Sequence, residues 1–154
     1  IIASIVIGFF QEDIEKVVAL AVLMPIVASM GGNAGMQTLA VTIRSIATNE
    51  LTKNNFTQNV IKEFSIGILN GIIFAFISAI VVHIWFNDLT LSLIISISMV
   101  LNMIVAGLFG IVVPITLKKF NIDPAIASSV FVTTITDVIG FLSFLGVGAF
   151  FFYN

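Results

Sequence analysis

Three separate hydrophobic segments of this chain carry polar or flexible residues near their middle. These residues are Gly31-Gly32-Asn33, Asn102 and Asp137. An ionised carboxylate in the hydrocarbon core of a membrane is energetically expensive, so such a residue usually faces a polar cavity and serves a function. Asp137 is therefore the first candidate for a site that handles a charged ligand.

Small and polar residues surround Asp137 along its expected helix. Thr133 and Thr134 precede it by one turn, and Gly140 follows it by one turn. Counted from Pro124, Asp137 lies about 20 Å along a helix that rises about 1.5 Å per residue, close to the bilayer centre. The alternatives are a protonated structural carboxyl, a proton relay and a cation partner. We favour the cation, because no second acid is expected at that depth to receive a proton.

The oxygen donors expected near Asp137 suit a hard cation. Carboxylate, amide, hydroxyl and backbone carbonyl oxygens favour Mg²⁺ or Ca²⁺ over soft metals. One acid per chain is too few for a cage made of protein alone. It fits a Mg²⁺ ion that keeps most of its water between two copies of the chain, each offering one Asp137 across a two-fold axis. Asn33, Asn102 and Thr134 would complete an oxygen-rich wall around the water shell.

Two of these candidates have an equally simple structural interpretation. Asn102 interrupts a ridge of small residues and could merely provide an interhelical hydrogen bond of about 1 kcal/mol. Gly31 and Gly32 could permit close helix crossing. We favour an unwound Gly31-Gly32 segment, whose freed backbone groups line a water-filled path.

Composition places these residues in a membrane protein. Of the 154 residues, 59% are hydrophobic and only 9% are charged, whereas a soluble domain has roughly 25% charged residues. The net charge of -2 indicates no nucleic-acid partner, and the absence of cysteine excludes disulfides and thiolate metal sites within the chain. We therefore predict an all-α integral membrane protein in contact with lipid, with no catalytic residue and no organic cofactor.

Charged residues, prolines and glycines divide the chain into spans. The apolar stretch 1–10 is about half the length needed to cross a bilayer, which predicts a truncated first span. Complete spans are expected at about 14–47, 64–86, 90–117 and 124–152. The first of these is longer than a straight crossing, so we expect a break or kink at Pro25 or at the glycine pair. An interfacial helix is expected in the second half of the connector 44–63, and Asp123 followed by Pro124 should begin the last span.

The basic residues predict an orientation for this five-span bundle. Five of them fall in connectors that must share one side, which the positive-inside rule makes cytoplasmic: Arg44, Lys53, Lys62, Lys118 and Lys119. The truncated span then enters from the cytoplasm, Glu12, Asp13 and Glu15 form a solvated external edge, and the C-terminus is external in a multi-pass protein of the cell membrane.

Two ridges of small residues predict close helix packing. One ridge is Gly67, Gly71, Ala75 and Ala79, and the other is Ser98, Asn102, Ala106, Gly110 and Pro114. Small residues at this spacing let helix backbones approach closely in lipid. We expect these ridges to supply the packing surface of a homodimer.

Two segments resemble the MgtE family of magnesium channels and transporters. They run from Pro25 to Gln37, followed by Thr42-Ile-Arg44, and from Asp123 through Asp137 to Phe141. The resemblance implies a homodimer with five spans per protomer, a pore at the protomer interface and Asp137 as the pore aspartate. It also implies that 1–154 is a single transmembrane domain, without the cytoplasmic N-terminal region and CBS domains of many members. Gln11 stands where family members often have an acid.

The expected function is therefore channel-like Mg²⁺ transport by a homodimer. Two alternatives remain open at this point. A coupled carrier for divalent cations would need the same residues, and a non-transporting membrane anchor or receptor core would use Asp137 and Asn102 only as structural contacts.

Overall fold

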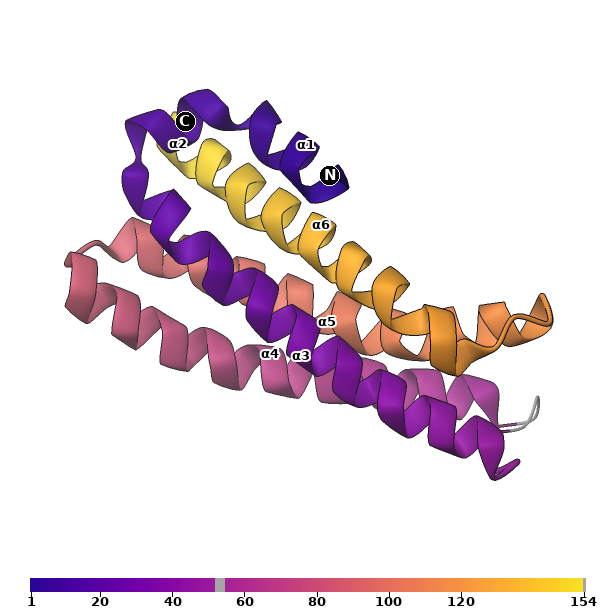
Figure 1. Ribbon diagram of the computed structural model, residues 1–154. Coiled ribbons are helices and arrows are strands. Elements are labelled where there is room, and N and C mark those ends of the chain that lie inside the picture. The colour runs from indigo at the N-terminus through magenta and orange to yellow at the C-terminus, as the bar shows by residue number, and fades with distance from the viewer. Residues whose placement is uncertain (52–54, 154) are drawn as a thin grey trace.

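The computed structural model describes residues 1–51 and 55–153, and every regular element within them is an α-helix. Two short helices, α1 (Ile2–Phe9) and α2 (Gln11–Lys16), precede four long ones (Figure 1). The long helices are α3 (Val18–Ala47), α4 (Phe56–Phe86), α5 (Leu89–Lys119) and α6 (Pro124–Tyr153). Each long helix is apolar enough to cross a membrane, which confirms the all-α membrane class. With 8 residues, α1 is too short to count as a fifth span by itself.

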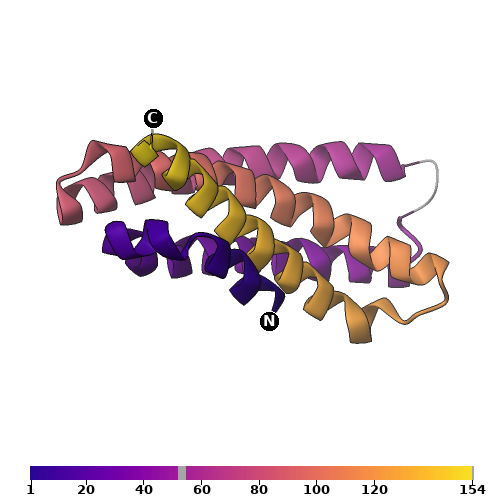
Figure 2. The same ribbon diagram turned by 90° about the horizontal axis from the view of Figure 1, so that it is seen from above.

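Helix α5 is the centre of the bundle. Each of α3, α4 and α6 packs against it, α3 also packs against α6, and α1 lies on α6 (Figures 1 and 2). The main apolar cluster joins α3, α5 and α6 through fully buried side chains such as Leu23, Ile94 and Phe144. This cluster holds α6, which carries Asp137, against α3 and α5.

Both ridges of small residues pack inside the protomer. A methyl group on Gly67 would lie 2.9 Å from the carbonyl oxygen of Met103 in α5. On the other ridge, a methyl group on Gly110 would lie 2.7 Å from Cβ of Thr38 in α3. The expectation that these ridges form the dimer surface is therefore wrong, because α5 already occupies the first ridge and α3 the second.

Helix α3 continues without interruption through Pro25, Gly31 and Gly32. The expected break and the unwinding of Gly31 and Gly32 are therefore wrong, while the alternative of a kink at Pro25 or at the glycine pair stays a prediction. An opened turn would leave backbone groups without partners in hydrocarbon, which is more unfavourable than two helical glycines at about 1 kcal/mol each. The 30 residues of α3 extend about 45 Å at about 1.5 Å per residue, so its ends reach beyond the hydrocarbon core.

Helix α4 begins much earlier than expected. It starts at Phe56 and runs unbroken to Phe86, so the helix predicted in the second half of the connector is present, but the expected boundary between it and the span at residue 64 is wrong. The amphipathic residues of that stretch form the first two turns of a long helix, because nothing in the sequence ends the helical pattern between them and the span. The other early boundary also differs, since α2 ends at Lys16 and α3 starts only at Val18.

Side chains define the corners between the long helices. Asp88 accepts hydrogen bonds from the backbone N–H groups of Thr90 (2.7 Å) and Leu91 (3.2 Å) at the start of α5. Asp123 accepts one from Ala125 N–H (2.9 Å), which confirms the predicted start of the last span. Three asparagines just after α3, α4 and α5 adopt left-handed backbone conformations, whereas no described glycine does: Asn49, Asn87 and Asn121.

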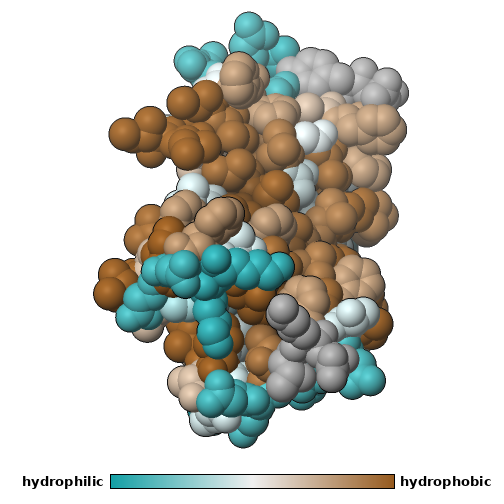
Figure 3. Space-filling view, turned by 90° about the vertical axis from the view of Figure 1, so that its right-hand side faces the viewer, coloured by the Kyte–Doolittle hydropathy of each residue, from teal (hydrophilic) through white to brown (hydrophobic). Residues whose placement is uncertain are grey.

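Four of the basic residues gather at one end of the bundle, whereas Lys16 ends α2 at the other end. Arg44 and Lys118-Lys119 are near the ends of α3 and α5, and Lys62 is near the start of α4; these three helix ends meet on the same side (Figure 1). Lys53 lies outside the described residues. Viewed from this side, hydrophilic side chains cluster among apolar ones (Figure 3). The flanks carry exposed apolar side chains such as Ile72 and Phe76 of α4, as expected for contact with lipid.

Candidate functional site

Asp137 lies in the middle of α6 and is half-buried in the protomer. No hydrogen bond or ion pair involves its carboxylate in the part of the chain that the structure describes. Within the same part, no group of three or more acidic, histidine or cysteine side chains could hold a metal ion. Among the described residues, a single protomer therefore leaves the carboxyl group of Asp137 without a partner at the edge of the helix bundle.

The two threonines before Asp137 lie beside it on α6 and are also half-buried. The hydroxyl of Thr133 donates to the backbone carbonyl of Ser129 in its own helix (2.9 Å). That bond uses the hydroxyl proton and leaves the oxygen lone pairs free to accept from a water molecule. Thr133 and Asp137 can thus both present acceptors to the water shell of a cation.

The structure brings three predicted residues from three helices together. The side chain of Asn102 from α5 lies between Gly31 of α3 and Gly140 of α6. Its Nδ2 donates a hydrogen bond to the carbonyl oxygen of Val27 (2.8 Å). Asn102 is 0% exposed, so its amide acts between helices and not at an open surface of the protomer.

The other residues of the glycine segment lie apart from this contact. Asn33 is exposed on α3, so its amide faces away from the three-helix contact. Gly32 is half-buried, and a methyl group on it would meet only the hydroxyl oxygen of Thr136, at 4.0 Å. Gly32 therefore borders α6 loosely, while Gly31 touches Asn102 directly.

A buried seam on α6 was missed in the sequence analysis. Its members recur every four residues and all are buried: Ser128, Val132, Thr136, Gly140 and Phe144. The seam packs on α3, where a methyl group on Gly35 would lie 2.8 Å from Cγ1 of Val132. The four-residue spacing of small and hydroxyl residues was the signal that could have revealed it. This seam sets which side of α6 faces inward, and Asp137 lies at its edge.

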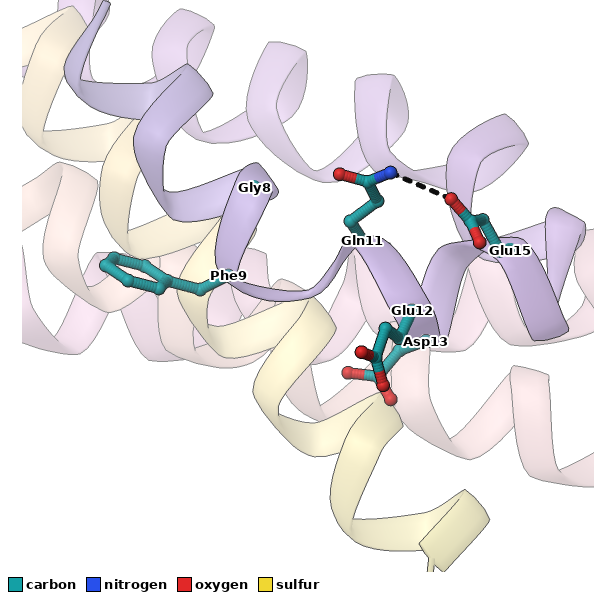
Figure 4. Close-up of a pocket in the computed structure, with 6 residues that line it drawn as sticks. All are labelled: Gly8, Phe9, Gln11, Glu12, Asp13 and Glu15. Atoms are coloured by element: carbon teal, nitrogen blue, oxygen red, sulfur yellow. Dashed lines mark hydrogen bonds between the residues drawn. The ribbon is translucent and has the colours of Figure 1, made fainter.

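An acidic pocket lies at the opposite end of the bundle from the four grouped basic residues (Figure 1), and Figure 4 shows the side chains that line it. It has a volume of about 560 Å³ and is lined by α1, α2 and the turn between them: Gly8, Phe9, Gln11, Glu12, Asp13 and Glu15. Gln11 Nε2 donates to Glu15 Oε1 at 2.8 Å. Glu12 and Asp13 extend to the other side of α2 (Figure 4). Carboxylates grouped in this way raise the local concentration of cations.

Comparison with known proteins identifies the family. A sequence model of the MgtE family, described as a divalent cation transporter, matches residues 24–147. The chain belongs to the MgtE family. This matched range contains every candidate from Gly31 to Gly140, and MgtE is a family of transporters, not of enzymes.

Three bacterial relatives match almost the whole chain. The magnesium transporter MgtE of Bacillus subtilis is 34% identical over 154 residues, which is 100% of this chain and 34% of the relative. The MgtE protein of Thermus thermophilus is 32% identical over 95% of this chain and 32% of its own length. That of Enterococcus faecalis is 30% identical over 92% of this chain and 31% of its own length. The chain thus spans about a third of the length of these MgtE relatives.

Proposed function

We propose that this chain is a transmembrane domain that carries Mg²⁺ across the membrane through a path shared by two copies. The observation that carries the proposal is Asp137, a half-buried carboxylate in a membrane-spanning helix with no partner among the described residues of its own protomer. Such a charge needs a counterion or water. Its place in an MgtE segment and the magnesium transporters named above support Mg²⁺ as the ion.

The homodimer follows from the donor chemistry. Mg²⁺ demands near-ideal octahedral geometry and gives up its water reluctantly, so it is commonly held by one or two carboxylates with several waters retained. One Asp137 from each of two chains across a two-fold axis provides that set. Thr133, Thr134 and Asn33 would contact the water shell. In this arrangement the ion passes hydrated, and the path behaves as a channel.

The direction of the domain in the membrane follows from its charges. The end that carries Arg44, Lys62, Lys118 and Lys119 would face the cytoplasm. The acidic pocket around α2 would then face outward and concentrate Mg²⁺ near the outer mouth of the path. The C-terminus is external in this orientation.

Uptake of Mg²⁺ into liposomes that contain a Mg²⁺-sensitive dye tests the function. Asp137→Ala and Asp137→Asn should eliminate uptake, and Asp137→Glu should retain part of it with altered selectivity, because the charge remains but its reach changes. Asp88→Asn is the matched control: it removes an acid outside the path, and the amide oxygen can still cap α5, so uptake should stay normal. Full uptake by Asp137→Ala would exclude the mechanism, and a protein that carries no Mg²⁺ at all would favour a membrane anchor.

A further inference from the structure

We propose that Asn102 is a positioning residue, which holds α6 against α3 and thereby fixes the place of Asp137 without touching the ion. The inference rests on the proposed function of Asp137. It goes beyond that function because it assigns a separate task to a residue that is buried away from the surface where a hydrated ion could pass.

The first observation is the hydrogen bond that Asn102 makes across helices. Its Nδ2 donates to the carbonyl oxygen of Val27 at 2.8 Å, with no part of the side chain exposed. The hydroxyl of Ser98 in α5 differs in this respect: it is also 0% exposed, but it donates to Ile94 in its own helix at 2.7 Å. Of these two buried polar side chains, Asn102 is the one that ties α5 to α3.

The second observation is how closely the amide fills the space between two glycines. A methyl group on Gly31 would come within 2.6 Å of Cγ of Asn102, and one on Gly140 would lie 2.8 Å from Nδ2. Neither helix can carry a side chain at its contact point. The amide therefore acts as a spacer of fixed thickness between α3 and α6, and its thickness sets how far apart these two helices lie.

The spacer is directly linked to Asp137 by the geometry of α6. Gly140 follows Asp137 by three residues, so the two lie on neighbouring parts of the helix surface, about 4.5 Å apart along the axis. A helical turn is stiff, and a shift or rotation of α6 at Gly140 would move the carboxylate by a similar amount. Asn102 can thus control the distance between the two Asp137 side chains of a dimer.

The third observation is that half of the amide remains unsatisfied. Oδ1 of Asn102 is buried and has no hydrogen-bond partner among the described residues. A buried acceptor without a partner is unfavourable, and an apolar side chain of similar shape would avoid the penalty. An amide is therefore not the side chain that would give the greatest stability at this position. What it contributes is a fixed geometry, because its N–H group must reach the carbonyl oxygen of Val27.

Asn102→Leu tests the inference, because leucine keeps the branched shape and removes the donor. The protein in liposomes should still take up divalent cations, but the ratio of Mg²⁺ to Ca²⁺ uptake should fall by about tenfold, in the range of mutations that act without ligand contact. Ser98→Ala is the matched control. It removes a buried hydroxyl one turn away that bridges no helices, and the same ratio should change by less than about twofold.

A distance measurement provides a readout that does not depend on transport. Because this chain has no cysteine, spin labels can be attached to Val41→Cys in α3 and Val130→Cys in α6, both at exposed positions. Asn102→Leu should shift or broaden the distance distribution between the labels by about 2 Å, the size of helix shifts in switching proteins. Ser98→Ala should leave the distribution unchanged.

A paired substitution separates positioning from simple packing. Gly31→Ala alone should fold poorly because its methyl group meets the amide, and Asn102→Ala should relieve that conflict when the two are combined. The double variant should thus recover folded protein while keeping the altered uptake ratio and label distance, because the bond to Val27 is still missing. If Asn102→Leu does not fold, the double variant still tests whether Asn102 positions α6.

Each outcome decides one of the two proposals. Normal uptake ratio and normal label distance in the folded Asn102 variants would overturn the positioning role, as would equal changes in Ser98→Ala. If Asp137→Ala transported Mg²⁺ normally, the proposed function would fail, and the label distances alone would still decide whether Asn102 positions α6.

Discussion

Thr38 Oγ1 donates a hydrogen bond to Glu63 Oε2 at 3.1 Å and so joins α3 to α4, two helices that otherwise make few contacts with each other. Both helices pack mainly on α5. The same threonine touches Gly110 of α5, so its side chain lies at a junction of three helices near the basic end.

Thr38→Val should lower the free energy of unfolding by about 1 kcal/mol, because it removes a half-buried hydrogen bond to a charged group while keeping the side-chain shape. Unfolding of the detergent-solubilised protein by increasing SDS measures this change. Thr116→Val is the control, since its exposed hydroxyl donates only to Val112 in its own helix. An equal loss in both variants would mean that the link between α3 and α4 contributes nothing.

Gly67→Ala should destabilise the protein by about 1–3 kcal/mol, the usual range for extra carbon atoms in a tight core. Its methyl group would meet the backbone of α5, at Met103 and Ile104, and a backbone cannot rotate away as a side chain can. Gly146→Ala is the control, because its nearest neighbour would be Cζ of Phe10 at 4.0 Å. Melting temperatures of the two variants compare them, and similar values would contradict the close packing of α4 on α5.

Asn33→Ala and Thr134→Ala should each reduce Mg²⁺ selectivity by no more than about tenfold, roughly 1.4 kcal/mol. A hydrated ion makes many weak contacts through its water, so the loss of one neutral oxygen is tolerated. Competition between Mg²⁺ and Ca²⁺ in liposome uptake measures the effect. A loss as severe as that of Asp137→Ala would indicate that the oxygen binds the ion directly.

Neutralising the acidic pocket should slow uptake without changing selectivity. The triple variant Glu12→Gln, Asp13→Asn and Glu15→Gln removes charges that attract cations, so uptake at low ionic strength should fall by about two- to tenfold. The difference from wild type should disappear in about 1 M salt, where charges are screened within about 3 Å. A difference that persists at high salt would mean that these carboxylates bind the ion themselves.

The helices that carry the site could be predicted because their ends are chemically marked. The Asp123-Pro124 start, the Asn87-Asp88 corner and Lys118-Lys119 each combine a polar group with a change in hydropathy. The position of Asp137 in the middle of α6 follows from such a boundary by simple counting. Where no marker separates two stretches, as before Phe64, the prediction divided one helix into two.

The partners of Asn102 and Gly31 could not be predicted in the same way. Sequence spacing gives the face of a helix but not which neighbour covers it, so the small ridges were assigned to a second copy when α3 and α5 already cover them. The continuity of α3 could not be predicted for the same reason, because it depends on which residues pack against the helix. A glycine pair considered alone suggests a break, whereas a glycine that packs against the amide of Asn102 remains helical.

The turns after α3, α4 and α5 contain asparagines in left-handed conformations, and most of the glycines lie in helices where another helix of the same chain approaches. This reverses the usual distribution in water-soluble proteins, in which glycine makes the turns. Attempts to stabilise the protein by replacing glycine with alanine will thus mostly meet a neighbouring helix, whereas Asn49, Asn87 and Asn121 are the places where glycine itself could be introduced to ease a left-handed turn. Engineering for structural work on this member of the MgtE family should therefore begin at its asparagines.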